Sequence, residues 1–594
     1  MSLKKIQSMQ ELLKSKNLTM VIVPTQDYHM SEYVGEYFKS RAYLSGFSGS
    51  AGTLLVTTDG AYLWTDGRYF IQAEKEIQGL GINLMKAGMP SVPTISEFIK
   101  NTLKANDTLC FDGRVLSINE GNEYKEIAKS VGATILSTED LVDGLWNERP
   151  TLSKEPAYLL NLEQIGQSAS DKIARVRKIM QENNADLHII GSLDEVAWLY
   201  NIRGNDVENT PLLMSFAVID TEKAYLFAIE ETINDEVRNE LEKQGIEVRA
   251  YDEIYKFIST IDKDRTVMLD KDKLNFAIKE AINANIIFVK NPTYIMKAIK
   301  NEVELNNTRI AHIKDGVAIT KLMHWIKTNV GKIPMNEVDI ETKVFELRSE
   351  QDGFMDISFD SIVGYKEHAA MMHYHATEDI AYDIKAESML LIDSGGHYTT
   401  GTTDITRTFI LGDITEEEKR DFTCVLKGVI NLSNAKFLYG CNGINLDILA
   451  RGALWQLGID YRCGTGHGVG HLSVIHEGPN GFRWKIVPER NDSGVLEAGM
   501  ITTIEPGVYT EGSHGIRIEN ELICQKSELN EYGQFMNFET ITFAPIDIDG
   551  IDTSIMTKTE IEWLNSYHKA VFEKISPFLN EEEKEWLKTY TRAI

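Results

Sequence analysis

Four acidic residues between positions 390 and 520 each end or interrupt an apolar, strand-like segment. Asp393 follows Met-Leu-Leu-Ile, and Glu505 follows Ile-Thr-Thr-Ile. Asp404 precedes Ile-Thr-Arg-Thr-Phe, and Glu519 ends Gly-Ile-Arg-Ile. A carboxylate that points into an apolar interior is costly unless it is paired or binds a metal ion. Although a single Asp or Glu is far more often a surface charge, four in these settings indicate a buried cation site.

The strand patterns predict how these acids approach one another. The segments before Asp393 and after Asp404 have the composition and period-2 alternation of strands. A turn around Gly395-Gly396 is expected to fold them into a hairpin, so that both aspartates face one cavity. Arg517 and Glu519 are two residues apart, so they are expected to share one face of a strand.

A histidine in the glycine-rich run 464–470 supplies a nitrogen donor. Glycines on both sides of His467 let the backbone come close to a crowded site. Four carboxylates and one imidazole suit a pair of divalent cations such as Mn²⁺, Co²⁺ or Zn²⁺, and two such ions can share a hydroxide that attacks a carbonyl. His373 and His476 are candidates to hold the substrate carbonyl and its oxyanion, with a structural core role as the alternative for each.

Two other interpretations of the glycine-rich run fit the sequence less well. A nucleotide-binding loop needs a preceding strand, a following helix and a lysine, and the run lacks this setting. His471 lies four residues after His467, as in a zinc-binding helix, but the glycines at 468 and 470 disfavour a helix. We therefore expect His471 to be accessory.

Six short motifs in a fixed order make this region resemble a known clan. They are Ile-Asp-Ser-Gly, Thr-Thr-Asp-Ile-Thr-Arg-Thr, Gly-His-Gly-Val-Gly, His-Glu-Gly-Pro, Glu-Pro-Gly and Ile-Arg-Ile-Glu-Asn. Their order and spacing are similar to those of the pita-bread metallopeptidases, which include methionine aminopeptidase, prolidase and aminopeptidase P. The resemblance implies two metal ions held by Asp393, Asp404, His467, Glu505 and Glu519.

The charge balance and the cysteines limit the partners and the compartment. Acidic residues number 89 against 61 basic ones, a formal net charge of −28. Phosphate binding needs clustered Lys and Arg, so we expect neither nucleic acid nor an anionic membrane as a partner. Five cysteines without paired spacing indicate a reducing, cytoplasmic compartment. The sequence contains no apolar run long enough to cross a bilayer, and its first residues have helical rather than signal-peptide patterning.

The length of 594 residues predicts several domains, and the first half of the chain indicates a duplication. We expect an α/β domain at 1–150, with two strands joined by a turn at Asp59-Gly60, and a second, related α/β domain at 151–300. Residues 301–545 carry the motifs, and 546–594 are expected to form helices packed on that domain. The predicted class is α+β, with a C-terminal pita-bread catalytic domain preceded by two creatinase N-terminal-like α/β domains.

Further motifs near residues 65, 195 and 312, together with the tail around 562–568, narrow the resemblance to the three-domain cytosolic form of aminopeptidase P. This resemblance implies a manganese-dependent exopeptidase that removes the first residue of peptides with proline in second position, as a homodimer. Glu505 would take a proton from the attacking water and pass it to the leaving proline nitrogen. Cys463 departs from the pattern, because eukaryotic relatives usually carry a histidine of a proton relay there. Arg68 could reach a substrate or a dimer partner, or could form a plain salt bridge.

Two alternatives remain open at this point. A prolidase would cleave only Xaa-Pro dipeptides, so a tripeptide such as Arg-Pro-Pro would distinguish it. A non-catalytic pita-bread protein, such as a histone chaperone, would bind partners instead. Such proteins have typically lost the metal ligands, whereas this sequence retains all five.

Overall fold

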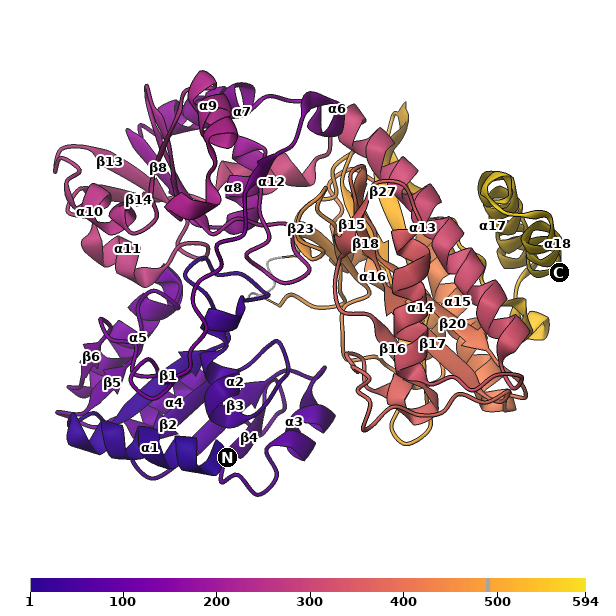
Figure 1. Cartoon of the computed structure of the whole chain (residues 1–594), viewed down its shortest axis with the longest axis horizontal. Coiled ribbons are helices and arrows are strands. Elements are labelled where there is room, and N and C mark those ends of the chain that lie inside the picture. The colour runs from indigo at the N-terminus through magenta and orange to yellow at the C-terminus, as the bar shows by residue number, and fades with distance from the viewer. Residues whose placement is uncertain (1, 488–491) are drawn as a thin grey trace. The chain divides into compact units, whose positions relative to one another are not determined.

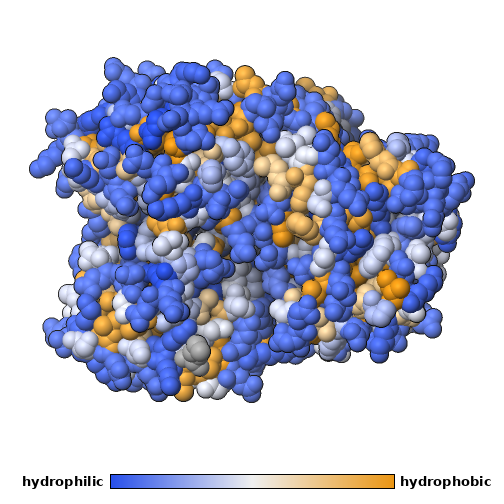
Figure 2. All heavy atoms as spheres, viewed as in Figure 1, coloured by the Kyte–Doolittle hydropathy of each residue, from blue (hydrophilic) through white to orange (hydrophobic). Residues whose placement is uncertain are grey.

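The structure is a computed structural model that describes residues 2–487 and 492–594. The chain divides into two compact units (Figure 1). The first unit contains Met1–Asn161 and Gln167–Thr293, and the second contains Leu162–Gly166 and Tyr294–Ile594. On the face drawn in Figure 2, hydrophilic side chains predominate and apolar ones are scattered among them, as expected for a strongly acidic chain. Among the described residues, no helix combines the length and the apolar character needed to span a membrane.

Two six-stranded sheets of the same topology form the first unit. The strands of the first sheet follow the order β4-β3-β2-β1-β5-β6, and those of the second follow β12-β11-β10-β8-β13-β14. In both sheets the first strand in sequence pairs antiparallel with the second and parallel with the fifth. The strands are β1 (Met20–Pro24), β2 (Thr53–Thr57), β3 (Ala61–Thr65), β4 (Asn83–Lys86), β5 (Thr108–Cys110), β6 (Thr134–Leu136), β8 (Leu187–Ile190), β10 (Ser215–Asp220), β11 (Ala224–Ala228), β12 (Ile246–Ala250), β13 (Thr266–Leu269) and β14 (Asn285–Phe288). The predicted duplication is confirmed, and so is the turn between β2 and β3.

Helices pack against both sheets, and several of them begin at residues whose side chains cap the first turn. In the first half they are α1 (Ser2–Ser15), α2 (Ser40–Ser45), α3 (Phe70–Glu76), α4 (Ile95–Thr102) and α5 (Ile118–Val131), and in the second half α7 (Ala169–Glu182), α8 (Leu193–Tyr200), α9 (Asp235–Lys243), α10 (Glu253–Ser259) and α11 (Phe276–Ala281). The Ser117 hydroxyl accepts the backbone N–H of Glu120 at the start of α5. His29 joins the two halves of the unit through Nδ1, 2.7 Å from the Gly191 carbonyl, and Nε2, 2.6 Å from the Tyr251 hydroxyl.

The second unit consists of antiparallel sheets with long helices packed against them. One sheet has the strand order β16-β17-β20, a second β15-β18-β19 and a third β21-β28-β27-β24-β22-β23, while β25 and β26 form a hairpin. The strands are β15 (Phe354–Ile357), β16 (Ile362–Tyr365), β17 (Met389–Ser394), β18 (Gly396–Tyr398), β19 (Gly401–Thr402), β20 (Ile405–Ile410), β21 (Phe437–Leu438), β22 (Gly466–Gly468), β23 (Glu477–Phe482), β24 (Ile501–Ile504), β25 (Gly507–Thr510), β26 (His514–Arg517), β27 (Asn520–Asn530) and β28 (Gly533–Thr540). The helices are α6 (Leu162–Ile165), α12 (Pro292–Ala298), α13 (Glu302–Asn329), α14 (Glu337–Ser349), α15 (Glu416–Ser433) and α16 (Gly443–Trp455).

The tail of the chain packs on this second unit. Helices α17 (Lys558–Ile575) and α18 (Glu581–Tyr590) both contact α13. Lys327 of α13 lies 2.6 Å from Asp547 and 2.7 Å from Asp549, just before α17. Apolar side chains of the tail, among them Leu564 and Val571, belong to the same core cluster as those of α15 and α16. The tail is therefore an integral part of the core.

The hairpin that carries the two aspartates is longer than the sequence analysis predicted. Strands β17 and β20 pair antiparallel, with Asp393 opposite Thr406. The chain does not reverse at Gly395-Gly396, because these residues continue into β18, which pairs with β19 and places the reversal at 399–400. The predicted turn was therefore wrong in position, since the glycines serve a close approach to the facing strand instead: a Cβ on Gly395 would collide with the Thr403 carbonyl.

Candidate metal centre

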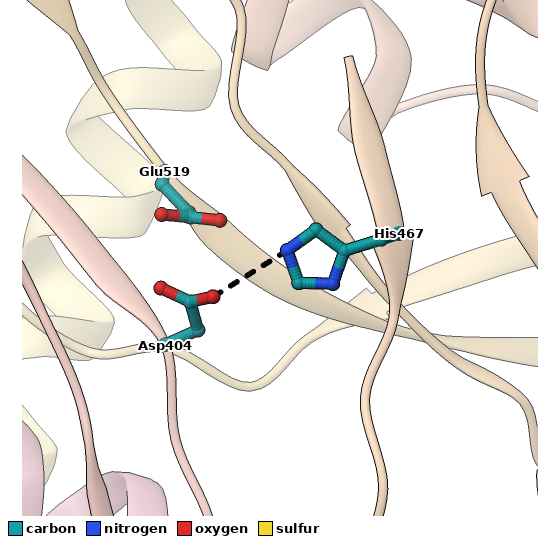
Figure 3. A group of neighbouring side chains, drawn as sticks. All are labelled: Asp404, His467 and Glu519. Atoms are coloured by element: carbon teal, nitrogen blue, oxygen red, sulfur yellow. Dashed lines mark ion pairs between the residues drawn. The ribbon is translucent and has the colours of Figure 1, made fainter. Parts of the chain in front are cut away.

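Three of the predicted ligands meet in one buried cluster of the second unit. Asp404 lies between β19 and β20, His467 on β22, and Glu519 between β26 and β27. One ligand atom from each residue lies within 4.8 Å of those of the other two (Figure 3). His467 Nε2 is 3.5 Å from Asp404 Oδ2. Segments separated in sequence thus bring two carboxylates and an imidazole to one point.

The remaining two predicted ligands adjoin this cluster. Glu505, directly after β24, places Oε1 3.6 Å from His467 Nε2. Burial is the main cause that raises the pKa of Asp404, Glu505 and Glu519, and the charge of Asp393 raises it further in all three carboxyls. The five residues predicted from the sequence thus interact with one another electrostatically.

The electrostatics of the cluster fit a site for cations. Burial, and then the negative charges of Asp393 and Glu505, raise the pKa of Asp404 well above its ordinary value. Burial, and then the charge of Asp404, do the same to the pKa of Glu519. Among the described residues, Asp393 Oδ1, Asp404 Oδ1 and Glu519 Oε1 are buried and have no hydrogen-bond partner. Buried carboxylate oxygens rarely lack partners, and divalent cations would satisfy all three.

The tautomer of His467 suits a ligand. Its Nδ1 lies 3.0 Å from the Gly468 carbonyl oxygen. Because a carbonyl only accepts hydrogen bonds, Nδ1 carries the proton and donates it. The lone pair of Nε2 then faces Asp404 and Glu505, which is the arrangement that metal-binding histidines adopt.

Arg517 and Thr406 orient the acidic side chains. The Arg517 guanidinium donates through Nη2 to Asp393 Oδ2 and through Nη1 to the Tyr509 hydroxyl at 2.6 Å. The Thr406 hydroxyl donates to Glu519 Oε2 at 2.7 Å. The shared strand face predicted for Arg517 and Glu519 is thus directed at the centre.

The two histidines proposed for the substrate carbonyl have different supports. The ring centroid of His476 lies 4.3 Å from that of His467, at an interplanar angle of 81°. The next residue, Glu477, is buried and forms ion pairs with Lys297, at 3.0 Å, and with Lys300. This buried ion triad fixes the start of β23 immediately beside His476.

His373 lies in the irregular segment that follows β16, where it is half-buried. Glu337 of α14, which is completely buried, holds this segment on both sides of the histidine. Its Oε1 accepts the N–H of Tyr365 at 2.8 Å. Its Oε2 accepts the hydroxyl of Tyr374 and the N–H of Tyr382, both at 2.9 Å. One carboxylate thus anchors the loop that carries His373.

The other residues singled out from the sequence have identifiable surroundings. His471 lies 3.2 Å from the Thr308 hydroxyl and 3.0 Å from the Gln164 carbonyl, an accessory position. Burial, and then the charge of Glu505, raise the pKa of Cys463 to about 11, so the thiol retains its proton at neutral pH. In the first unit, Arg68 forms a bidentate pair with Asp66, at 2.9 and 2.8 Å.

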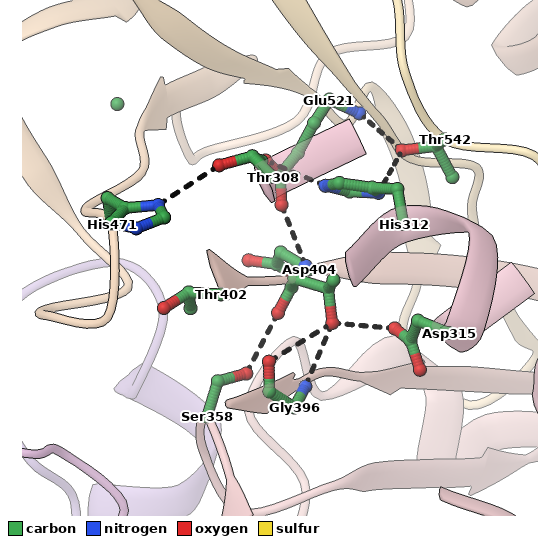
Figure 4. A network of polar contacts seen from close by, with 12 residues as sticks. Thr308, His312, Asp315, Ser358, Gly396, Thr402, Asp404, His471, Glu521 and Thr542 are labelled. Carbon is green, nitrogen blue, oxygen red and sulfur yellow. Dashed lines mark hydrogen bonds and ion pairs between the residues drawn. The ribbon is translucent and has the colours of Figure 1, made fainter. Parts of the chain in front are cut away.

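Glu521 and residues of α13 lie behind the aspartate hairpin and were not predicted from the sequence as part of the site. Glu521 Oε1 accepts the backbone N–H of Asp404 at 2.8 Å, and His312 of α13 lies 3.1 Å from Glu521 Oε2 (Figure 4). Asp315 of the same helix accepts the Thr403 hydroxyl at 2.7 Å. The alternation of residues 517, 519 and 521 would have placed Glu521 on the ligand face, but no local signal places α13 behind it.

Comparison with known proteins matches four family models along the chain. The family model described as "Creatinase/Prolidase N-terminal domain" matches residues 5–145, and a second of that description matches 148–304. The model "Metallopeptidase family M24" matches 306–526, and "C-terminal region of peptidase_M24" matches 534–594. A "Probable Xaa-Pro aminopeptidase P" of Coprinopsis cinerea is 37% identical over 616 residues, covering 100% of this chain and 98% of the relative. The chain belongs to metallopeptidase family M24.

Other members of the family agree over the whole length. "Aminopeptidase P2" of Arabidopsis thaliana is 37% identical, covering 96% of this chain and 86% of the relative. The crystal structure of X-prolyl aminopeptidase from Caenorhabditis elegans, described as a cytosolic enzyme with a di-nuclear active site, superposes with a TM-score of 0.94 at 33% identity. It covers 100% of this chain and 99% of that one. The predicted resemblance and the fold class, two creatinase N-terminal-like domains followed by a pita-bread domain, are confirmed.

Proposed function

We propose that this M24 metallopeptidase is an Xaa-Pro aminopeptidase, which removes the N-terminal residue from peptides with proline in second position. The observation that carries the proposal is the buried cluster of Asp404, His467 and Glu519, with carboxylate oxygens that lack partners among the described residues. This cluster belongs to a chain that is similar over its full length to aminopeptidases of that specificity.

Two divalent ions would be held by the five residues of the centre. Four carboxylates and one imidazole nitrogen favour Mn²⁺, with Co²⁺ or Zn²⁺ as the alternatives. Such ions supply Lewis-acid polarisation of the scissile carbonyl and lower the pKa of water. The ligand set is Asp393, Asp404, His467, Glu505 and Glu519.

Glu505 is the residue best placed to move protons. Its side chain is 21% exposed, compared with 6% for Asp404, so water and substrate can reach it. Burial raises its pKa, opposed by His467 and Arg517, which suits a general base that works near neutral pH. Glu505 accepts a proton from the attacking water and delivers it to the proline nitrogen as the C–N bond breaks. His476 and His373 donate to the carbonyl oxygen as it gains negative charge.

The resemblance to aminopeptidase P also implies an oligomeric state and a cellular compartment. We propose a homodimer, supported by a set of exposed apolar side chains on α16 and near β23: Ile448, Leu449, Trp455, Leu457, Trp484 and Ile486. A solution mass equal to the single-chain value of 67.1 kDa would contradict it. All five cysteines are free, which supports a reducing, cytoplasmic location. We also propose domain boundaries near 150, 300 and 545; the matched family ranges support the first two, whereas they place the last one between 526 and 534.

A manganese-supplemented peptide assay tests the proposal. We expect cleavage of Xaa-Pro-Yaa tripeptides and no cleavage of matched Xaa-Ala-Yaa peptides. Glu505→Gln should lower kcat by about 10²–10⁴-fold, the usual contribution of a general base, whereas Glu511→Gln, an exposed acid beyond β25, should have no effect. Equal cleavage of both peptide series would refute the specificity, and cleavage of dipeptides alone would indicate a prolidase. Full activity of Glu505→Gln would refute the role of that residue.

A further inference from the structure

A second buried acidic side chain lies close to the proposed ligand Glu519 in sequence. Glu521 lies two residues later, on β27, and is completely buried. Its contact with the Asp404 backbone places it beside the metal centre, but it belongs neither to the proposed ligands nor to the proton-transfer groups.

The carboxylate of Glu521 binds the backbone of a metal ligand. Its Oε1 accepts the N–H of Asp404 at 2.8 Å. Asp404 lies between the short strands β19 and β20, where its own N–H is outside the β17–β20 ladder. The contact with Glu521 thus fixes the peptide plane from which the Asp404 side chain projects.

His312 of α13 holds Glu521 from the opposite side. Its Nε2 lies 3.1 Å from Glu521 Oε2, and its Nδ1 lies 3.3 Å from the Thr542 hydroxyl (Figure 4). Thr542 in turn accepts the N–H of Glu521 at 2.8 Å. Both side chains of the Glu521–His312 pair are fully buried. The imidazole and the carboxylate are therefore packed against each other in the core.

We propose that Glu521, oriented by His312, is a positioning residue of the metal centre: by holding the Asp404 peptide, it directs the Asp404 carboxylate at the cations. This inference rests on the proposed metal-binding function and extends it to residues that do not touch the metal. Residues that orient metal ligands through hydrogen bonds typically contribute 10–100-fold to metal affinity or activity.

A second buried carboxylate, which binds the backbone of strand β20, provides a matched control. Asp547 is a completely buried carboxylate that accepts the N–H of Ile410 at 2.8 Å, at the opposite end of β20 from Asp404. Its charge is compensated by Lys327. Asp547→Ala therefore removes a buried hydrogen-bond acceptor of the β20 backbone without altering any proposed ligand. It should lower the melting temperature and leave metal affinity unchanged.

The test is a titration of the metal-free protein with Mn²⁺ alone, followed by calorimetry, with kcat/KM measured at saturating Mn²⁺ as a second readout. We expect Glu521→Ala to weaken Mn²⁺ binding by about 10–100-fold. Glu521→Gln should stay close to the wild type, because the amide oxygen still accepts from Asp404. If Glu521→Ala fails to fold, His312→Ala, which leaves the carboxylate in place but without its support, should weaken binding in the same direction.

Three results would overturn the inference. They are wild-type Mn²⁺ affinity in Glu521→Ala or in His312→Ala, an equal loss in Asp547→Ala, and a loss in Glu521→Gln as large as in Glu521→Ala. The last result would mean that the negative charge of Glu521, and not its hydrogen bond to Asp404, strengthens Mn²⁺ binding. A wild-type protein that binds no Mn²⁺ would remove the proposed function together with this inference, whereas two bound ions with unchanged variants would remove this inference alone.

Discussion

Adding a single methyl group at Gly395 should separate the two aspartate ligands. An ideal Cβ at this position would lie 2.9 Å from the carbonyl carbon of Thr403, and closer still to the carbonyl oxygen and to the Ser358 hydroxyl. Relaxed carbon–carbon contacts are about 3.5–4.0 Å, so the two segments must part by about 1 Å. Gly395 lies two residues after Asp393, and Thr403 directly precedes Asp404. The displacement is therefore transmitted to both carboxylates.

The expected cost of Gly395→Ala follows from this displacement. A misplacement of about 1 Å in a catalytic arrangement costs on the order of 100-fold in rate, and overpacking a core costs about 1–3 kcal/mol in stability. We expect kcat/KM on an Xaa-Pro-Yaa peptide to fall about 100-fold at saturating Mn²⁺, with weaker Mn²⁺ binding in calorimetry. Gly144→Ala is the matched control, because a Cβ there meets nothing within 4 Å and the backbone needs no left-handed conformation. A Gly395→Ala protein with kcat/KM and Mn²⁺ affinity within twofold of the wild type would refute the reasoning.

Two further predictions concern the loop anchor and the buried acids. Glu337→Ala releases the segment that carries His373, so kcat should fall and KM should rise in steady-state assays while Mn²⁺ affinity is unchanged; equal loss of Mn²⁺ binding would contradict a role confined to the loop. In the metal-free protein, the pKa values of Asp404 and Glu519 are raised by folding. The stability that these two carboxyls contribute is therefore fully present below the pKa of an unfolded carboxyl, about 4. It is lost as the pH rises through the pKa values of the folded protein. The free energy of unfolding of the metal-free protein should therefore decrease from pH 5 to pH 8 relative to the Mn²⁺-loaded protein, and a constant difference in denaturant titrations would argue against it.

The proposed metal ligands could be singled out from the sequence because each lies in a local pattern that would otherwise be unfavourable. Asp393 and Asp404 interrupt apolar strands, and His467 lies among glycines that no helix would tolerate. The duplication of the first unit was also predictable from the sequence, because its strands and turns recur in the same order. The capping box that opens α15, in which the Thr415 side chain accepts the N–H of Glu418, is likewise encoded in a short stretch of sequence.

The features that the sequence did not predict depend on contacts between distant segments. The hairpin turn was placed at Gly395-Gly396 because glycines are common in turns, whereas here the absence of a side chain allows the Thr403 carbonyl to approach. The motif around His312 supported the resemblance but does not show which residue His312 contacts, because its partner Glu521 lies more than 200 residues later. The position of the loop that carries His373 depends on Glu337, a distant residue on α14.

Two of the proposed ligand carboxylates are supported in the same way, which separates two ways of damaging the centre. In Asp393, Oδ2 is held by Arg517 while Oδ1 lacks a partner among the described residues. In Glu519, Oε2 is held by Thr406 while Oε1 lacks one. One oxygen of each pair thus sets the direction of the side chain and the other remains for a cation. Because removing a support leaves the cation-facing oxygen present but misdirected, it should impair geometry before it abolishes binding, whereas removing a ligand removes the binding atom itself.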